Sequence, residues 1–129
     1  MKKKVKVVAA IIENSAGEIL CALRSPKMII PNCWEFPGGK VEDGESLHDA
    51  IEREIEEELL CDVKAFDVFH NHIHEYDTFI IDLTCIKCKL ISGNPVATEH
   101  SKIIWLKREN LASLKWAPAD IPAMEELIK

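Results

Sequence analysis

The sequence predicts one α+β domain, an α/β/α sandwich around a central mixed sheet. β-branched apolar runs separated by turn residues predict several strands. An apolar residue at every fourth position predicts a long helix among them, and shorter helical patterns follow. The chain has 129 residues, of which 47% are hydrophobic, which suits a single domain over residues 1–129 with its own core.

The first third of the chain predicts short strands and turns. We expect a buried strand at Val5–Ile12, a turn at Glu13–Glu18, a second strand at Ile19–Arg24, a loop with two prolines at Ser25–Cys33, and a short extended piece at Trp34–Phe36 that ends at Pro37-Gly38-Gly39. These elements would form a hairpin that leads into a glycine-bearing bend.

The clearest helix runs from Ser46 to about Leu60. Ser46 can cap its N-terminus, and Asp49 follows in a capping-box position. The apolar stripe comprises Leu47, Ile51, Ile55 and Leu59. This stripe predicts that one side of the helix packs against the sheet.

The remaining elements complete the sandwich. We expect two long strands at Val63–His74 and Tyr76–Leu90 joined near Glu75, a turn at Ser92–Pro95, a short strand at Ile103–Leu106, a short helix at Arg108–Leu114 and a final helix at Pro122–Ile128. Strands and helices in this mixture are typical of layered sandwiches.

The charge and the composition exclude several classes of protein. A net charge of -6 argues against nucleic-acid binding, which needs a basic surface. No apolar run has the length of a membrane span, and the basic start at residues 1–4 leads into a strand rather than a signal sequence. The odd count of five cysteines suggests free thiols and a cytoplasmic location.

Acidic residues gather on the long helix. On a helical wheel with Glu54 at zero, Glu58 lies at about 40° and Glu57 at about -60°, beside the apolar stripe. Glu52 and Glu56 lie on the opposite side, where a solvated acidic face is expected. Like charges at this spacing repel each other, so hard cations would stabilise the cluster of Glu54, Glu57 and Glu58. Oxygen-only ligands favour Mg²⁺ or Mn²⁺.

The segment that starts at Gly38 reads GGKVEDGESLHDAIEREIEEELLC. It resembles the Nudix box, with Gly39, Glu45, Arg53, Glu54, Ile55, Glu57 and Glu58 in register. One position departs, because Leu60 stands where the family has a glycine that ends the helix in a left-handed conformation. We therefore expect the helix to end differently here.

The resemblance implies roles for the box residues. It makes Glu54, Glu57 and Glu58 metal ligands, joined by the Gly38 carbonyl. It gives Gly39 a structural role and pairs Glu45 with Arg53 as a brace between loop and helix. Lys40 matches a lysine that meets phosphate.

The resemblance to Nudix hydrolases of the MutT type covers most of the chain. Trp34 to Lys40 is similar to the segment before the box, which makes Glu35 and Phe36 substrate-binding candidates. Arg24 matches an arginine used on the nucleotide. Glu99, six residues before Trp105, matches a late metal-binding or catalytic glutamate. The tail around Asp120 resembles the segment that reads the base, with Phe36 and this tail expected to sandwich it.

The implied activity is magnesium-dependent hydrolysis of a nucleoside triphosphate to a monophosphate and pyrophosphate. The resemblance favours 8-oxo-dGTP and nucleotide-pool sanitation, a form of DNA repair, with (d)CTP or a modified cytidine triphosphate as the alternative. Glu99 or a helix glutamate would be the general base. A silent nucleotide-binding sensor, a Nudix enzyme with another diphosphate substrate and an isomerase on the same fold stay open. The partner would be the nucleotide, with the chain as monomer or homodimer.

Three further groups of residues have simpler interpretations. Cys85 and Cys88 have the spacing of a metal knuckle, but in a strand they point to opposite faces, which favours packing. His70, His72 and His74 share one strand face and predict a surface or pocket rim rather than a transition-metal site. Trp105 and Trp116 are expected in the core.

Overall fold

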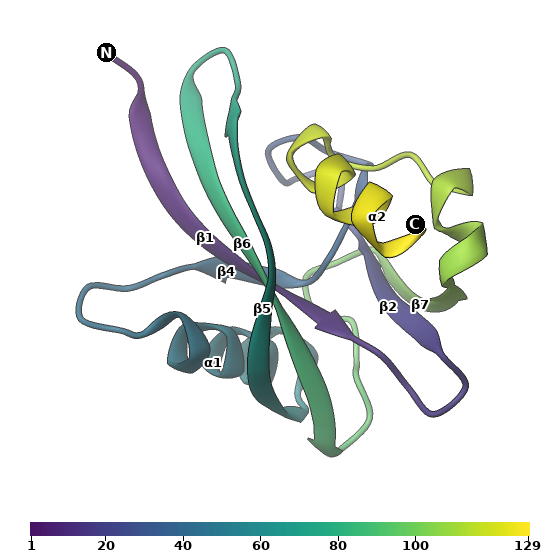
Figure 1. Ribbon diagram of the computed structural model, residues 1–129. Coiled ribbons are helices and arrows are strands. Elements are labelled where there is room, and N and C mark those ends of the chain that lie inside the picture. The colour runs from purple at the N-terminus through teal and green to yellow at the C-terminus, as the bar shows by residue number, and fades with distance from the viewer.

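A four-stranded mixed sheet forms the centre of the molecule, which a computed structural model describes over residues 1–129 (Figure 1). The strand order is β4 (Gly38–Lys40), β1 (Lys3–Ile12), β6 (Phe79–Ser92) and β5 (Asp62–Glu75). β1 and β6 are parallel, and the two outer pairs are antiparallel. The predicted mixed sheet is therefore confirmed.

A second, three-stranded antiparallel sheet has the order β3 (Trp34–Glu35), β2 (Glu18–Leu23) and β7 (Lys102–Lys107). The sequence predicted these strands without separating them from the first sheet. The pairing of Leu23 with Trp34 and with Lys102 brings the start of β3 and the start of β7 to the same end of β2.

Helices cover both faces of the four-stranded sheet (Figure 1). α1 (Leu47–Leu59) lies on one side, against β5, β4 and β1. The 3₁₀ helices η1 (Arg108–Ser113) and η2 (Pro118–Asp120) and the helix α2 (Ile121–Leu127) lie on the other side. The expected α/β/α layering is thus present.

Alternate residues of β1 enter two separate cores. Val8, Ala10 and Ile12 pack with α1, whereas Ala9 and Ile11 pack with α2 and η1. Period-two alternation in a strand produces this division. The whole second half of β1 is buried because helices cover both faces.

α1 begins and ends at well-defined residues. The Ser46 hydroxyl accepts a hydrogen bond from the Asp49 backbone N–H at 3.1 Å, as predicted. The expectation that Leu60 changes the helix end was wrong: Leu60 adopts φ 55° and ψ 37°, the left-handed conformation that a glycine would take. Leu60 is 59% exposed, so its packing offsets little of the backbone strain.

Several local predictions need correction. Gly38–Lys40 was expected to end an extended piece, but it forms β4 on the edge of the sheet beside β1. The predicted helix at 108–114 is a 3₁₀ helix. Glu52 was expected in a freely solvated position, but its carboxylate accepts a hydrogen bond from the Ala65 N–H at 2.9 Å.

The cysteines and tryptophans pack as predicted. Cys85 lies in the core beside α2 and Cys88 in the core beside α1, so they face opposite sides of β6. Trp116 is buried and Trp105 is partly buried against the α1 core. Neither α-helix has the length and apolar character needed to cross a membrane.

Candidate active site

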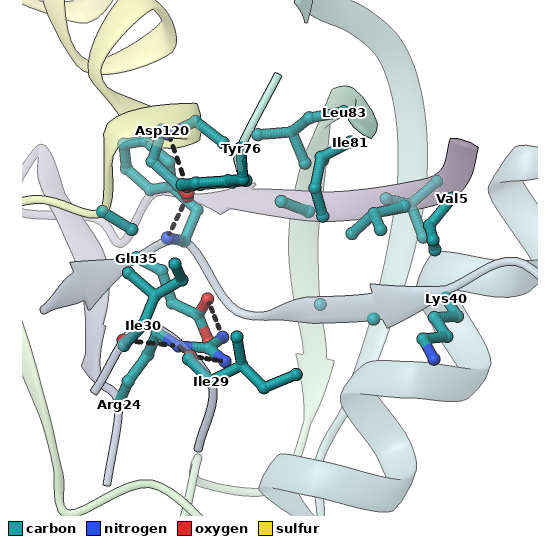
Figure 2. Close-up of a pocket in the computed structure, with 18 of the residues that line it drawn as sticks. Val5, Arg24, Ile29, Ile30, Glu35, Lys40, Tyr76, Ile81, Leu83 and Asp120 are labelled. Carbon is teal, nitrogen blue, oxygen red and sulfur yellow. Dashed lines mark hydrogen bonds and ion pairs between the residues drawn. The ribbon is translucent and has the colours of Figure 1, made fainter. Parts of the chain in front are cut away.

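A cavity of ≈ 360 Å³ opens beside β1 and β6 and reaches the C-terminal segment (Figure 2). Ile81 and Leu83 of β6 lie on one side of it, and Ile29 and Ile30 lie opposite, on the loop after β2. Of its 20 lining residues, 13 are hydrophobic. An apolar cavity with a few polar groups is typical of a small-molecule site.

A buried carboxyl lies at the inner end of this cavity. Asp120 Oδ2 accepts a hydrogen bond from the Phe36 backbone N–H at 3.0 Å. Burial raises the pKa of Asp120 well above its ordinary value, the negative charge of Glu35 raises it further, and the Phe36 N–H partly opposes both effects. The site therefore favours the neutral carboxylic acid.

The Phe36 ring itself is only 2% exposed and packs against Trp116, with ring centroids 4.6 Å apart. Its backbone N–H is the group that meets Asp120. Tyr76 was not singled out from the sequence, yet it lines the cavity and its hydroxyl accepts from the Ala119 N–H at 3.1 Å. His74 packs edge-on against this tyrosine, with ring centroids 4.6 Å apart.

Arg24 and Glu35 form the polar wall of the cavity (Figure 2). Arg24 donates to Glu35 Oε1 at 2.7 Å and to the Ile29 and Ile30 carbonyls at 2.8 and 3.1 Å. His100, which the sequence analysis missed, lies 2.8 Å from Glu35 Oε2 through Nε2. The only sequence signal for it was its position next to Glu99.

The expected brace joins loop and helix. Arg53 Nε donates to Glu45 Oε2 at 2.6 Å, and a second nitrogen donates to Oε1 at 2.9 Å. The same guanidinium reaches the Lys40 carbonyl at 3.1 Å. The Arg53 hydrogen bonds lower the pKa of Glu45, which keeps the pair charged.

Two glycines allow close approach between β4 and its neighbours. A Cβ atom at Gly38 would overlap the Val8 carbonyl of β1, and a Cβ atom at Gly39 would overlap the Glu54 carboxylate of α1. At Gly38 the obstacle is backbone, so only glycine fits there, whereas at Gly39 it is the end of a flexible side chain, which would have to move aside. The bend therefore brings the carboxylates of α1 up to the edge of the cavity, which Gly38, Gly39 and Lys40 line.

The acidic groups of α1 differ in their surroundings. The side chain of Glu54 is 12% exposed and accepts from Arg53 at 2.9 Å, whereas that of Glu57 is 58% exposed and lies 3.3 Å from Arg53. Burial, then a hydrogen bond with Glu54, and then the charges of Glu54, Glu35 and Glu99 together raise the pKa of Glu58 to about 9.

The structure thus brings Glu54, Glu35 and Glu99 each near Glu58, with Glu57 turned toward Arg53. No three His, Cys, Asp or Glu side chains converge in a ligating arrangement. The donor chemistry still fits a hard cation, since all the candidate ligands are oxygen atoms. A cation among these oxygens would offset the repulsion that raises the pKa of Glu58.

Comparison with known families gives the identity of this arrangement. The model of the NUDIX domain matches residues 7–126, almost the whole chain. The chain belongs to the Nudix family. The segment that resembles the Nudix box forms the loop and helix that carry Gly39, Glu45 and the carboxylates of α1.

Two relatives with named activities match this chain over nearly their full length. The chain is 38% identical over 123 residues to a CTP pyrophosphohydrolase of Escherichia coli K12, covering 95% of this chain and 90% of that protein. It is 30% identical over 127 residues to an 8-oxo-dGTP diphosphatase of Haemophilus influenzae, covering 98% and 93%.

Solved structures of Nudix proteins share the fold. A MutT protein of methicillin-resistant Staphylococcus aureus 252 is 50% identical, with a TM-score of 0.80 over 99% of this chain and 98% of that one. A MutT protein of Methanosarcina mazei Go1 is 25% identical, with a TM-score of 0.87 over 98% and 94%. The α+β Nudix fold is therefore confirmed.

Proposed function

We propose that this Nudix protein is a divalent-metal-dependent pyrophosphohydrolase that converts a nucleoside triphosphate and water into a monophosphate and pyrophosphate. One observation carries the proposal: a base-sized cavity with Asp120 at one end continues, through Gly38 to Lys40, to the carboxylates of α1. The relatives named for 8-oxo-dGTP and CTP hydrolysis support the same reaction.

Glu54, Glu57 and Glu58, with Glu99 and the Gly38 carbonyl, would hold Mg²⁺, or Mn²⁺ in its place. When bound, such a cation neutralises phosphate charge and lowers the pKa of water. Glu57 would turn from its contact with Arg53, which its exposed position permits. Gly39 leaves room for the Glu54 carboxylate to face the phosphate chain.

The remaining polar groups bind and orient the nucleotide and accept the proton of the attacking water. Lys40 is exposed at the cavity edge, where its ammonium group meets phosphate oxygens. Arg24, held by Glu35, faces the nucleotide from the opposite wall. Glu99 or a glutamate of α1 accepts the proton of the attacking water.

The protonation state of Asp120 determines which base the cavity prefers. A neutral carboxyl can donate a hydrogen bond to a carbonyl oxygen, as on an oxidised guanine, whereas an ionised one accepts from the exocyclic amine of cytosine. The raised pKa of Asp120 favours the donor, so we place 8-oxo-dGTP first. The 38% identity to a CTP pyrophosphohydrolase keeps cytidine triphosphates as the second candidate.

A nucleotide panel tests the proposal. Purified protein with Mg²⁺ would be given dGTP, 8-oxo-dGTP, CTP, dCTP and 5-methyl-dCTP, with pyrophosphate as the readout. We expect release with 8-oxo-dGTP to exceed that with the others. Tight nucleotide binding without any release would instead show a silent sensor.

A matched pair of variants tests the carboxylate assignment. Glu57→Gln should lower turnover by about 10²–10⁴-fold, since it removes a charged oxygen ligand. Glu56→Gln is the control, because Glu56 is exposed on the side of α1 opposite the candidate metal ligands. Equal activity in the two variants would refute the role of Glu57.

A further inference from the structure

His100 is a buried imidazole with one strong partner. Its side chain is 2% exposed, and Nε2 lies 2.8 Å from Glu35 Oε2. Its Nδ1 atom is buried and has no hydrogen-bond partner. An ionised carboxylate only accepts hydrogen bonds, so Nε2 carries the hydrogen and donates it to Glu35.

The segment around His100 is attached at three places. The Thr98 hydroxyl donates to the Glu58 carbonyl of α1 at 2.6 Å, and the Ser101 N–H donates to the Leu23 carbonyl of β2 at 2.9 Å. His100 supplies the third attachment, to Glu35 of β3. Glu99 is exposed between these attachments, near enough to raise the pKa of Glu58.

Glu35 receives hydrogen bonds from two directions, because Arg24 donates to Oε1 while His100 donates to Oε2. The carboxylate plane is therefore fixed by two donors on separate segments. Without His100, Oε2 loses this donor and the Glu35 carboxylate is held by Arg24 at Oε1 alone, which leaves it free to tilt relative to Arg24.

We propose that His100 is a positioning residue, which orients Glu35 and Arg24 for the nucleotide and holds Glu99 beside Glu58. The inference rests on the proposed function of the site and adds a residue that touches neither the nucleotide nor a metal ion. Together with the hydrogen bond from Ser101 to Leu23, this side chain ties the segment that carries Glu99 to the wall that carries Arg24.

Stability and activity together distinguish a positioning role of His100 from a purely structural one. The unpartnered Nδ1 atom costs stability, and Glu35 keeps Arg24 if the imidazole is removed. His100→Leu should therefore melt close to the wild-type temperature. If His100 only filled space, this variant would also keep its activity.

The test compares three substitutions at one position. Gln places its amide N–H close to the position of Nε2, whereas Asn is one carbon shorter and Leu has no donor. We expect kcat/KM for the preferred nucleotide to fall about 10–100-fold in His100→Asn and His100→Leu. His100→Gln should stay within a few-fold of wild type. His70→Gln, on β5, is the control for an amide in place of a half-buried histidine that does not line the cavity.

Mn²⁺ binding without nucleotide, measured by electron paramagnetic resonance, gives a second readout that does not depend on turnover. It should weaken in the Asn and Leu variants and persist in the Gln variant. The inference is overturned if folded His100→Leu keeps wild-type kcat/KM and Mn²⁺ affinity, or if the Gln variant falls as far as Asn. If His100→Leu does not fold, the comparison of kcat/KM and Mn²⁺ affinity between His100→Gln and His100→Asn still tests the inference. A wild-type protein that binds Mn²⁺ but hydrolyses no nucleotide would refute the proposed function alone.

Discussion

Replacing Asp120 by Asn should change how stability depends on pH. The unfolded carboxyl loses its proton above about pH 3.9. The folded one keeps it to a higher pH, because burial and then the charge of Glu35 raise its pKa. The folded state therefore binds more protons in this window, and the free energy of unfolding falls as the pH rises toward the folded pKa.

The size of the effect follows from linkage. Each pH unit between the two pKa values lowers the stability of the wild type by up to about 1.4 kcal/mol relative to Asp120→Asn. Asn keeps a carbonyl oxygen for the Phe36 N–H, so the hydrogen bond of 3.0 Å can persist. Glu58 also has a raised pKa, but it is present in both proteins and cancels in the difference.

Urea denaturation of both proteins between about pH 4 and pH 8 measures this difference. We expect the stability of Asp120→Asn minus that of wild type to increase with pH and then level off above the folded pKa. Parallel curves over the whole range would refute the neutral carboxyl, and with it the reason for placing 8-oxo-dGTP first.

Three other changes have expected outcomes. Leu60→Gly should raise the free energy of unfolding by about 1 kcal/mol, and Tm by about 4 °C, because it relieves the left-handed strain of a leucine that is mostly exposed. A lower Tm in calorimetry would contradict this. Gly39→Ala should remove most of the activity with little loss of stability, because the new Cβ pushes aside the carboxylate at the end of the flexible Glu54 side chain. Unchanged activity would show that this contact is not needed. Mg²⁺ should raise Tm more as the pH rises toward 9. Burial and neighbouring carboxylates raise the pKa of Glu58 to about 9, and a cation binds only the ionised form. Equal shifts of Tm at pH 6 and pH 9 would exclude Glu58 as a ligand.

The sequence predicted α1 and its box well because local rules act together there. Ser46 caps the helix, the apolar stripe at Ile51, Ile55 and Leu59 is buried, and the Arg53 pairing follows from the box spacing. A strong local pattern leaves little for tertiary contacts to change.

Features that depend on distant segments were missed. β4 forms only because Gly38 and Gly39 can lie against β1, and a glycine pair alone predicts a turn. Glu52 meets Ala65 across a loop. His100 meets Glu35 across 65 residues, and no periodicity in a single sequence reports such a contact.

The left-handed Leu60 shows a different limit. Propensity favours glycine at that position, but the chain keeps the same backbone with leucine and accepts the strain. The preference of a residue is a small energy, and the packing of α1 on one side and β5 on the other outweighs it.

The parallel pairing of β1 with β6 also bears on biosynthesis. Val7–Ile12 of β1 pair with residues 83–88 of β6 in the middle of the sheet. More than half of the chain must therefore leave the ribosome before this pairing can form. Until then an apolar strand is exposed on the nascent polypeptide, and such segments are prone to aggregate. We expect slow refolding after dilution from denaturant, and a yield that improves when a holding chaperone is present during translation.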